Sequence, residues 1–191
     1  MESTYKFDAN IQGILRCEVT IACGSATNSR MVLLDSGAGV CHISYPLWCL
    51  MGMNEVCFND NPRLLNLMGI KSADEMTFNN LPLLANTTIL GNSFRAKSYE
   101  FRLDKLTIGL PTLSSNAITL ENITVRVIES NAHEFIVGWN VLKYLRTNYT
   151  PSPAQSIYKI TLDTNGEALF QQDRANGISN NLQNRFIYLQ T

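Results

Sequence analysis

The sequence predicts a mostly β protein with a few short helices. Long stretches alternate apolar and polar residues, most clearly Tyr99–Ile108 and Ile118–Ile128, and a period of two is typical of strands. Short polar segments with Gly, Asn or Ser separate these stretches, as expected of turns. The chain has 191 residues, of which 45% are hydrophobic and 16% charged, so we expect a single globular domain over residues 1–191.

The first two strands are expected to pair as a hairpin. Ile14–Ala22 alternates, Gly24–Asn28 has the composition of a turn, and Arg30–Leu34 continues as a second strand. Asp35 follows directly, at the mouth of a buried strand. Burying a carboxylate there costs several kcal/mol unless the charge is used or satisfied.

Two short helical segments are predicted after this hairpin. Val40–Ile43 resumes an extended pattern, and Ser44 then has the character of an N-cap. Pro46 is tolerated in the first turn of a helix that ends at Leu50. Pro62–Met68 predicts a further helical turn or two.

A second hairpin is predicted around a small polar tip. Thr87–Leu90 and the residues from Phe94 onward form its two arms. Gly91 and Asn92 between them readily adopt the positive φ angles that such a tip needs.

A short apolar strand and a helix are predicted near residue 140. Phe135–Val137 is wholly apolar, the pattern of a strand buried on both faces, and Gly138 ends it. Trp139–Tyr144 is expected to be a short helix, in which Trp139 and Asn140 serve packing and the helix start rather than substrate contact.

The C-terminal region is expected to form a third hairpin and a docked tail. Thr150–Pro153 has the composition of a linker, and Ile157–Leu162 and Ala168–Gln171 flank the turn signal Asp163–Gly166. The tail contains four large apolar residues, Phe186–Leu189, so we expect it to pack against another surface.

Composition argues against several classes of protein. The formal net charge is −1 and no basic run occurs, so nucleic acid is not an expected partner. No apolar window has the length of a membrane helix, and the N-terminus lacks a secretory signal, so we expect a cytoplasmic protein without a membrane partner. Five cysteines without a CxxC pair, and two histidines, indicate free thiols and no metal site or other cofactor.

Three segments in this order resemble one known family. Asp35-Ser36-Gly37-Ala38 after an apolar strand, the hairpin at Gly91, and Phe135–Asn140 before a helix are similar to the retropepsins, the retroviral-type aspartic proteases and their cellular and bacterial relatives. The resemblance covers about Gln12 to Arg146. It implies a single-domain acid protease barrel with a core of about residues 12–146, and dimer contacts in residues 151–191.

The resemblance also implies roles for individual residues. Asp35 would be catalytic within the active-site loop Ser36, Gly37 and Ala38, and the flap over the substrate would have its tip at Leu90, Gly91 and Asn92. Hydrolysis by carboxyl groups alone needs two of them about one water molecule, sharing one proton. Since the chain has no second Asp-Ser/Thr-Gly, the expected enzyme is a homodimer that cleaves peptides or proteins without a cofactor.

Other interpretations stay open at this point. Asp-Ser-Gly alone is also an ordinary turn. The chain could be a catalytically silent module of the same fold, used for dimerisation or peptide binding, or a β-barrel that binds an apolar ligand. A thiol-protease dyad of Cys41 with His42 is not expected, because neighbouring residues of a strand point to opposite faces.

Overall fold

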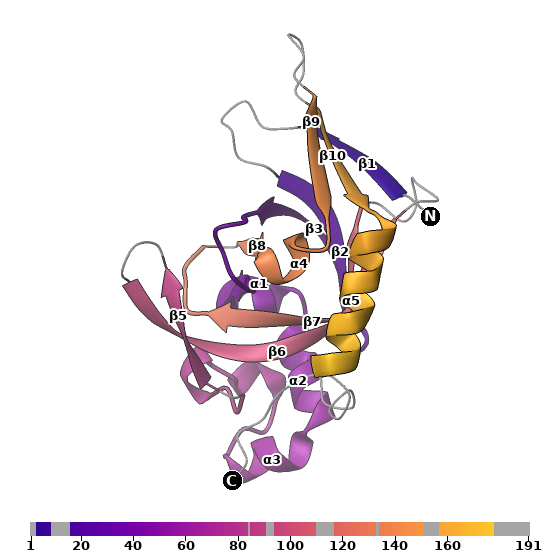
Figure 1. The fold of residues 1–191 in the computed structure, drawn as a ribbon. Coiled ribbons are helices and arrows are strands. Elements are labelled where there is room, and N and C mark those ends of the chain that lie inside the picture. Colours follow the sequence, from indigo (N-terminus) through magenta and orange to yellow (C-terminus); the bar gives the residue numbers. More distant parts are fainter. Residues whose placement is uncertain are drawn as a thin grey trace.

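The computed structural model is mostly β with a few short helices (Figure 1). Its strands form a seven-stranded sheet in the order β2-β3-β8-β4-β7-β6-β5 and a three-stranded sheet in the order β1-β10-β9. The structure describes residues 3–8, 16–83, 85–90, 94–109, 117–132, 134–150 and 157–177. Across these ranges, no helix is long and apolar enough to span a membrane.

The large sheet curls back on itself. Its strands are β2 (Arg16–Cys23), β3 (Ala26–Leu34), β4 (Cys41–Ser44), β5 (Ala85–Leu90), β6 (Phe94–Ile108), β7 (Ile118–Ile128) and β8 (Phe135–Val137). Besides pairing with β3, β2 pairs with β6, where Val19 lies opposite Ile108. The predicted bounds of β7 and β8 are confirmed.

The core lies against the inner face of this sheet. Alternate residues of β2 and β6 are buried, among them Ile21 and Phe101, and their neighbours on the same strands face outward. Trp48 of the helical segment is fully buried and meets Phe101 edge to face, with ring centroids 6.2 Å apart. Burying a side chain of this size stabilises the fold by about 2–3 kcal/mol before entropy is counted.

The small sheet joins segments far apart in the chain. It contains β1 (Ser3–Asp8), β9 (Arg146–Thr150) and β10 (Ile157–Leu162), with β10 antiparallel to both neighbours. Figure 1 shows it reaching beyond one end of the large sheet. The strand β9 was not predicted from the sequence, because its pairing partner lies beyond a proline-rich segment.

Short helices fill the connections. They are α1 (Tyr45–Leu50), α2 (Met53–Asp60), α3 (Pro62–Leu67), α4 (Trp139–Leu142) and the single turns η1 (Ala73–Glu75) and η2 (Phe78–Asn80). Ser44 occupies the N-cap position of α1, but its hydroxyl does not cap the helix. Instead it accepts a hydrogen bond from the backbone N–H of Glu134 at 3.1 Å, which ties β4 to the start of β8.

The prediction of a third hairpin was wrong. Residues Thr164–Gly177 form the helix α5, which includes the predicted strand Ala168–Gln171. Asp163 begins the helix, because its Oδ1 accepts a hydrogen bond from the backbone N–H of Gly166 at 2.8 Å. The tetrapeptide Asp163–Gly166 suits a turn and a helix start equally, and the helix formers that follow Gly166 favour the helix.

Three expectations concern residues outside the described part of the chain. They are the flap tip at Gly91 and Asn92, the linker at Pro151 and Pro153, and the apolar tail Phe186–Leu189.

Candidate active site

Asp35 follows directly after β3 and continues the pairing of that strand with β8. Its backbone N–H donates to the carbonyl of Val137 at 3.0 Å, so the pairing of these strands extends one residue past Leu34. Leu34 faces the core with 8% of its surface exposed. Because side chains alternate, Asp35 lies on the opposite face with Leu33, partly open to solvent.

A tight turn orients the carboxylate. Asp35 Oδ1 accepts a hydrogen bond from the backbone N–H of Gly37 at 2.8 Å, and its carbonyl accepts one from Ala38 at 3.2 Å. A Cβ atom at Gly37 would lie 3.1 Å from this same Oδ1 and crowd it. Ser36, between them, is exposed. The turn therefore leaves the second carboxylate oxygen free for other partners.

Backbone hydrogen bonds from the segment after β8 hold the loop of residues 35–40 in place. This loop joins β3 to β4, and β8 lies between these two strands, parallel to β3 and antiparallel to β4. The backbone N–H of Trp139 donates to the carbonyl of Ala38 at 2.6 Å, and that of Asn140 to Gly39 at 3.1 Å. The start of α4 thus holds the loop that carries Asp35.

Gly138 is required where the two segments cross. A Cβ atom there would lie 2.6 Å from the carbonyl carbon of Val40 and 2.7 Å from the carbonyl oxygen of Ala38. Its φ is −97°, so the demand is for space and not for a left-handed backbone. Its backbone N–H donates to Cys41 Sγ at 3.3 Å. Burial raises the pKa of this thiol to about 12, which leaves it protonated and a poor nucleophile.

Asn140 joins the loop to β7. Its Oδ1 accepts a hydrogen bond from the backbone N–H of Cys41 at 2.9 Å, and its Nδ2 donates to the carbonyl of Thr124 at 2.9 Å. The sequence identified Asn140 only as a helix-start residue, since these partners are remote along the chain. Trp139 differs from its expected packing role, because 51% of its surface is exposed.

His42 lies on the same face of the sheet as Asp35. Burial lowers the pKa of His42 below its usual value of 6.5, and the charge of Arg126 acts in the same direction. A hydrogen bond with the backbone of Val40 and the negative charges of Asp35 and Glu134 oppose this shift. His42 is therefore mostly neutral at pH 7 and senses the charge of the candidate catalytic group.

The structure brings together only part of the expected site. Asp35, Ser36, Gly37 and Ala38 form one turn, whereas Leu90 ends β5 and pairs with Phe94 at the far end of the β5–β6 hairpin (Figure 1). Within the described residues, no second carboxyl group bonds to Asp35, and no cluster of His, Cys, Asp or Glu has the arrangement of a metal site.

Comparisons with known proteins give a distant similarity among solved structures. No protein-family model and no curated protein matches the chain. Among solved structures, a retropepsin-like aspartic protease from Rickettsia conorii matches with 12% sequence identity and a TM-score of 0.49, over 85% of this chain and 94% of that one. A similarity this low decides neither the fold family nor the activity of the chain.

Proposed function

We propose that this chain is a retropepsin-type aspartic endopeptidase that acts as a homodimer. The observation that supports this most is Asp35, a partly exposed carboxylate at the end of a core strand, held in a glycine turn. A strand end that served only for packing would not need Asn140, Gly138 and Trp139 to hold its loop so closely.

The proposed reaction uses Asp35 from both chains. With the two carboxyl groups about 3 Å apart, they share one proton. The ionised group takes a proton from water, whose oxygen bonds to the peptide carbon, while the protonated partner donates to the carbonyl oxygen. When the C–N bond breaks, a proton passes to the leaving nitrogen. Each Asp35 therefore alternates between base and acid.

The rest of the chain has supporting roles in this proposal. Residues 1–191 form one retropepsin-like barrel domain, and the β5–β6 hairpin, with Leu90, Gly91 and Asn92 at its tip, covers the bound peptide. A two-fold axis beside Asp35 makes the same loop face itself in the partner. The small sheet of β1, β9 and β10 and the residues after 177 would supply further dimer contacts.

An apolar-ligand binder is less well supported. A pocket of about 360 Å³ lies between the sheet and α5, and its lining includes Glu100, Arg126, Lys143, Asp173 and Arg174. So many charges do not suit an apolar ligand. The pocket does not include Asp35, although its lining reaches Val40 at the end of the Asp35 loop.

The proposal is tested by removing one charge. Asp35→Asn keeps the size of the side chain, so we expect the fold and the dimer to persist while hydrolysis of an unfolded protein falls by at least about a thousandfold. Asp74→Asn, an exposed residue of η1, is the matched control and should keep full activity. Cleavage by Asp35→Asn at the wild-type rate would refute the assignment and favour a silent or binding role.

A further inference from the structure

One face of α5 packs against the segment that ends α4. Of the 14 residues of α5, Gly166 and Phe170 are buried. A Cβ atom at Gly166 would clash with the carbonyl oxygen of Tyr144, so the start of α5 lies directly on the backbone of that residue. The ring of Phe170 meets the ring of Tyr144 edge to face, with centroids 5.1 Å apart. Both buried residues of α5 therefore lie against Tyr144.

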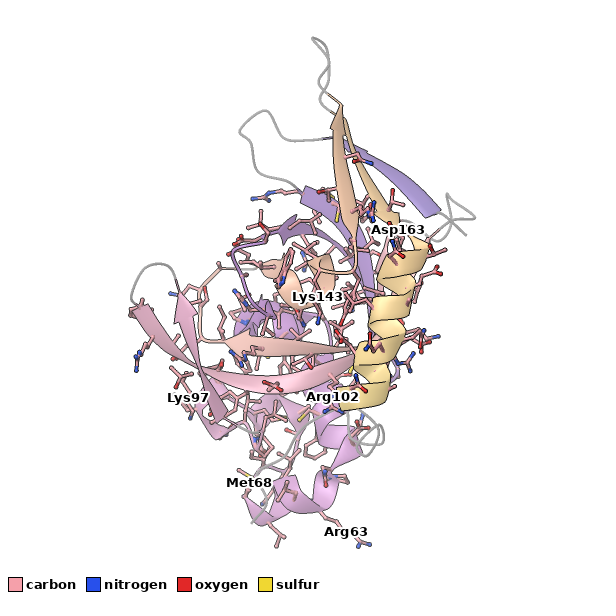
Figure 2. The ribbon with its side chains drawn as sticks, in the orientation of Figure 1. Arg63, Met68, Lys97, Arg102, Lys143 and Asp163 are labelled. Carbon is pink, nitrogen blue, oxygen red and sulfur yellow. The ribbon has the colours of Figure 1, made fainter. Side chains whose placement is uncertain are left out.

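Asp173 continues this face of the helix. Positions 166, 170 and 173 are separated by four and three residues, so they lie on one side of α5. Oδ2 of Asp173 accepts hydrogen bonds from Nζ of Lys143 at 2.5 Å and from the hydroxyl of Tyr144 at 2.7 Å. Figure 2 shows Lys143 beside α5. These two hydrogen bonds lower the pKa of the Asp173 carboxyl, which is therefore ionised at neutral pH.

The helix α4 depends on contacts with other elements for its position. It is four residues long, and a helix this short is not stable through its own hydrogen bonds. Gly138 occupies its N-cap position and has no side chain that could cap it. Lys143 is its C-cap residue, and Tyr144 follows. The contacts with α5 therefore hold α4 at its C-terminal end.

Backbone hydrogen bonds connect this end of α4 to the loop of Asp35. The N–H of Lys143 donates to the carbonyl of Trp139 at 3.0 Å, and the N–H of Trp139 donates to the carbonyl of Ala38 at 2.6 Å. The N–H of Ala38 in turn donates to the carbonyl of Asp35 at 3.2 Å. A continuous series of hydrogen bonds therefore joins Asp173 to Asp35.

We propose that Asp173 is a positioning residue for the candidate active site: by holding Lys143 and Tyr144, it fixes α4 and, through α4, the loop that carries Asp35. The inference rests on the proposed function, and it gives α5 a part in that same site. A displacement of about 1 Å in a catalytic group can slow a reaction about a hundredfold. The expected effect of Asp173 is therefore on the chemical step and not on peptide binding.

Amide hydrogen exchange tests the positioning without the need for activity. Asp173→Ala removes both hydrogen bonds, so the amides of Trp139 and Asn140, which donate to the Asp35 loop, should exchange at least about fivefold faster than in the wild type. Amides of the β6–β7 pairing around Phe101 and Val125 should keep their wild-type rates. A general loss of stability would instead accelerate exchange in both places.

The variant is expected to fold. Lys143 and Asp173 have 34% and 36% of their side-chain surfaces exposed, and an ion pair this open contributes little to overall stability. Glu167→Ala is the matched control, because it removes an exposed carboxylate from the same helix and should leave exchange and activity unchanged. Asp173→Asn keeps an oxygen acceptor for Lys143 and Tyr144 and should recover part of any loss.

Steady-state kinetics test the consequence for catalysis. The assay uses a protein concentration at which specific activity no longer depends on concentration, so that a weakened dimer does not affect the result. The kcat of Asp173→Ala should fall at least about tenfold, while KM changes by less than about threefold. This division is expected when the reacting groups are displaced and the peptide is still bound.

The outcomes separate the two proposals. Exchange at Trp139 and Asn140 that Asp173→Ala leaves unchanged would refute the positioning role, whether or not the protein cleaves peptides. Faster exchange confined to this segment, with a wild type that cleaves no peptide, would support the positioning and refute the protease assignment alone. Faster exchange with the wild-type kcat would refute the part of Asp173 in catalysis, and faster exchange throughout the sheet would show a structural role instead.

Discussion

Gly138 and Val40 approach so closely that a Cβ atom on Gly138 would lie 2.6 Å from the carbonyl carbon of Val40. This contact fixes how the segment after β8 passes beneath the loop of Asp35. The obstructing atoms belong to the backbone, so no side-chain rotation can relieve the clash. The position of the Asp35 carboxylate therefore depends on the lack of a side chain at Gly138, which lies 103 residues further along the chain.

Gly138→Ala should destabilise the protein and displace the Asp35 loop. Forcing one carbon into a filled space costs about 1–3 kcal/mol, and a backbone obstacle places this change at the upper end or above. We expect the free energy of unfolding in urea to fall by about 3 kcal/mol or more. Gly39→Ala is the control, because its added Cβ would meet nothing within 4 Å. Equal stability of the two variants would contradict the close packing at Gly138.

Asn140→Ala should have a different effect, through lost hydrogen bonds. It leaves the N–H of Cys41 and the carbonyl of Thr124, both in part-buried hydrogen bonds, without their partner, and an unsatisfied buried group costs about 1–3 kcal/mol. We expect a loss of about 2–4 kcal/mol in urea unfolding. Asn66→Ala, at an exposed position of α3, should change stability by less than about 0.5 kcal/mol. A loss of stability no larger than that of the control would mean that the two hydrogen bonds of Asn140 contribute little to the stability of the fold.

His42 should make the protein less stable in mild acid. Its folded pKa lies below the unfolded value of about 6.5, so the unfolded chain binds the proton more readily. The contribution is fully present above pH 6.5 and is lost as the pH falls below it. Urea unfolding at pH 7.5 and 5.5 should show a smaller decrease for His42→Gln than for the wild type. An identical decrease in both would contradict the lowered pKa.

The fluorescence of Trp139 should report formation of the proposed dimer. It is half exposed and bonded to the Asp35 loop, whereas Trp48, the other tryptophan, is fully buried. On association, a residue beside the two-fold axis loses contact with water, so acrylamide quenching should decrease as protein concentration rises. Trp139→Phe should abolish this concentration dependence. If sedimentation detects a dimer and quenching stays constant, Trp139 lies outside the interface.

Local patterns predicted much of the fold. The bounds of β7 and β8 follow from alternation and from an uninterrupted apolar run, which depend only on which faces are buried. The position of Asp35 at the end of a strand was predicted for the same reason. The α5 helix was missed because Asp163–Gly166 suits both a turn and a helix start, so composition did not separate the two.

Contacts between residues far apart in the chain could not be predicted from the sequence. Asn140 bonds to Cys41 and Thr124, and Gly138 contacts Val40, through a crossing that only the order of strands creates. The pairings of Leu33 with Ile136, and of His42 with Ile136 and Arg126, likewise depend on register between strands that are distant in the chain. His42 was considered only with its neighbour Cys41, whereas its partners in the sheet are Ile136 and Arg126.

The central claim, that two copies of Asp35 form one active site, is tested most directly by mixing subunits. Wild type and Asp35→Asn are unfolded in urea, combined, and refolded together at a fixed amount of wild-type chain. If heterodimers are inactive, activity per wild-type chain should fall to about half in an equal mixture and to about a tenth with tenfold excess of the variant. Activity per wild-type chain that stays constant at every ratio would contradict a shared site.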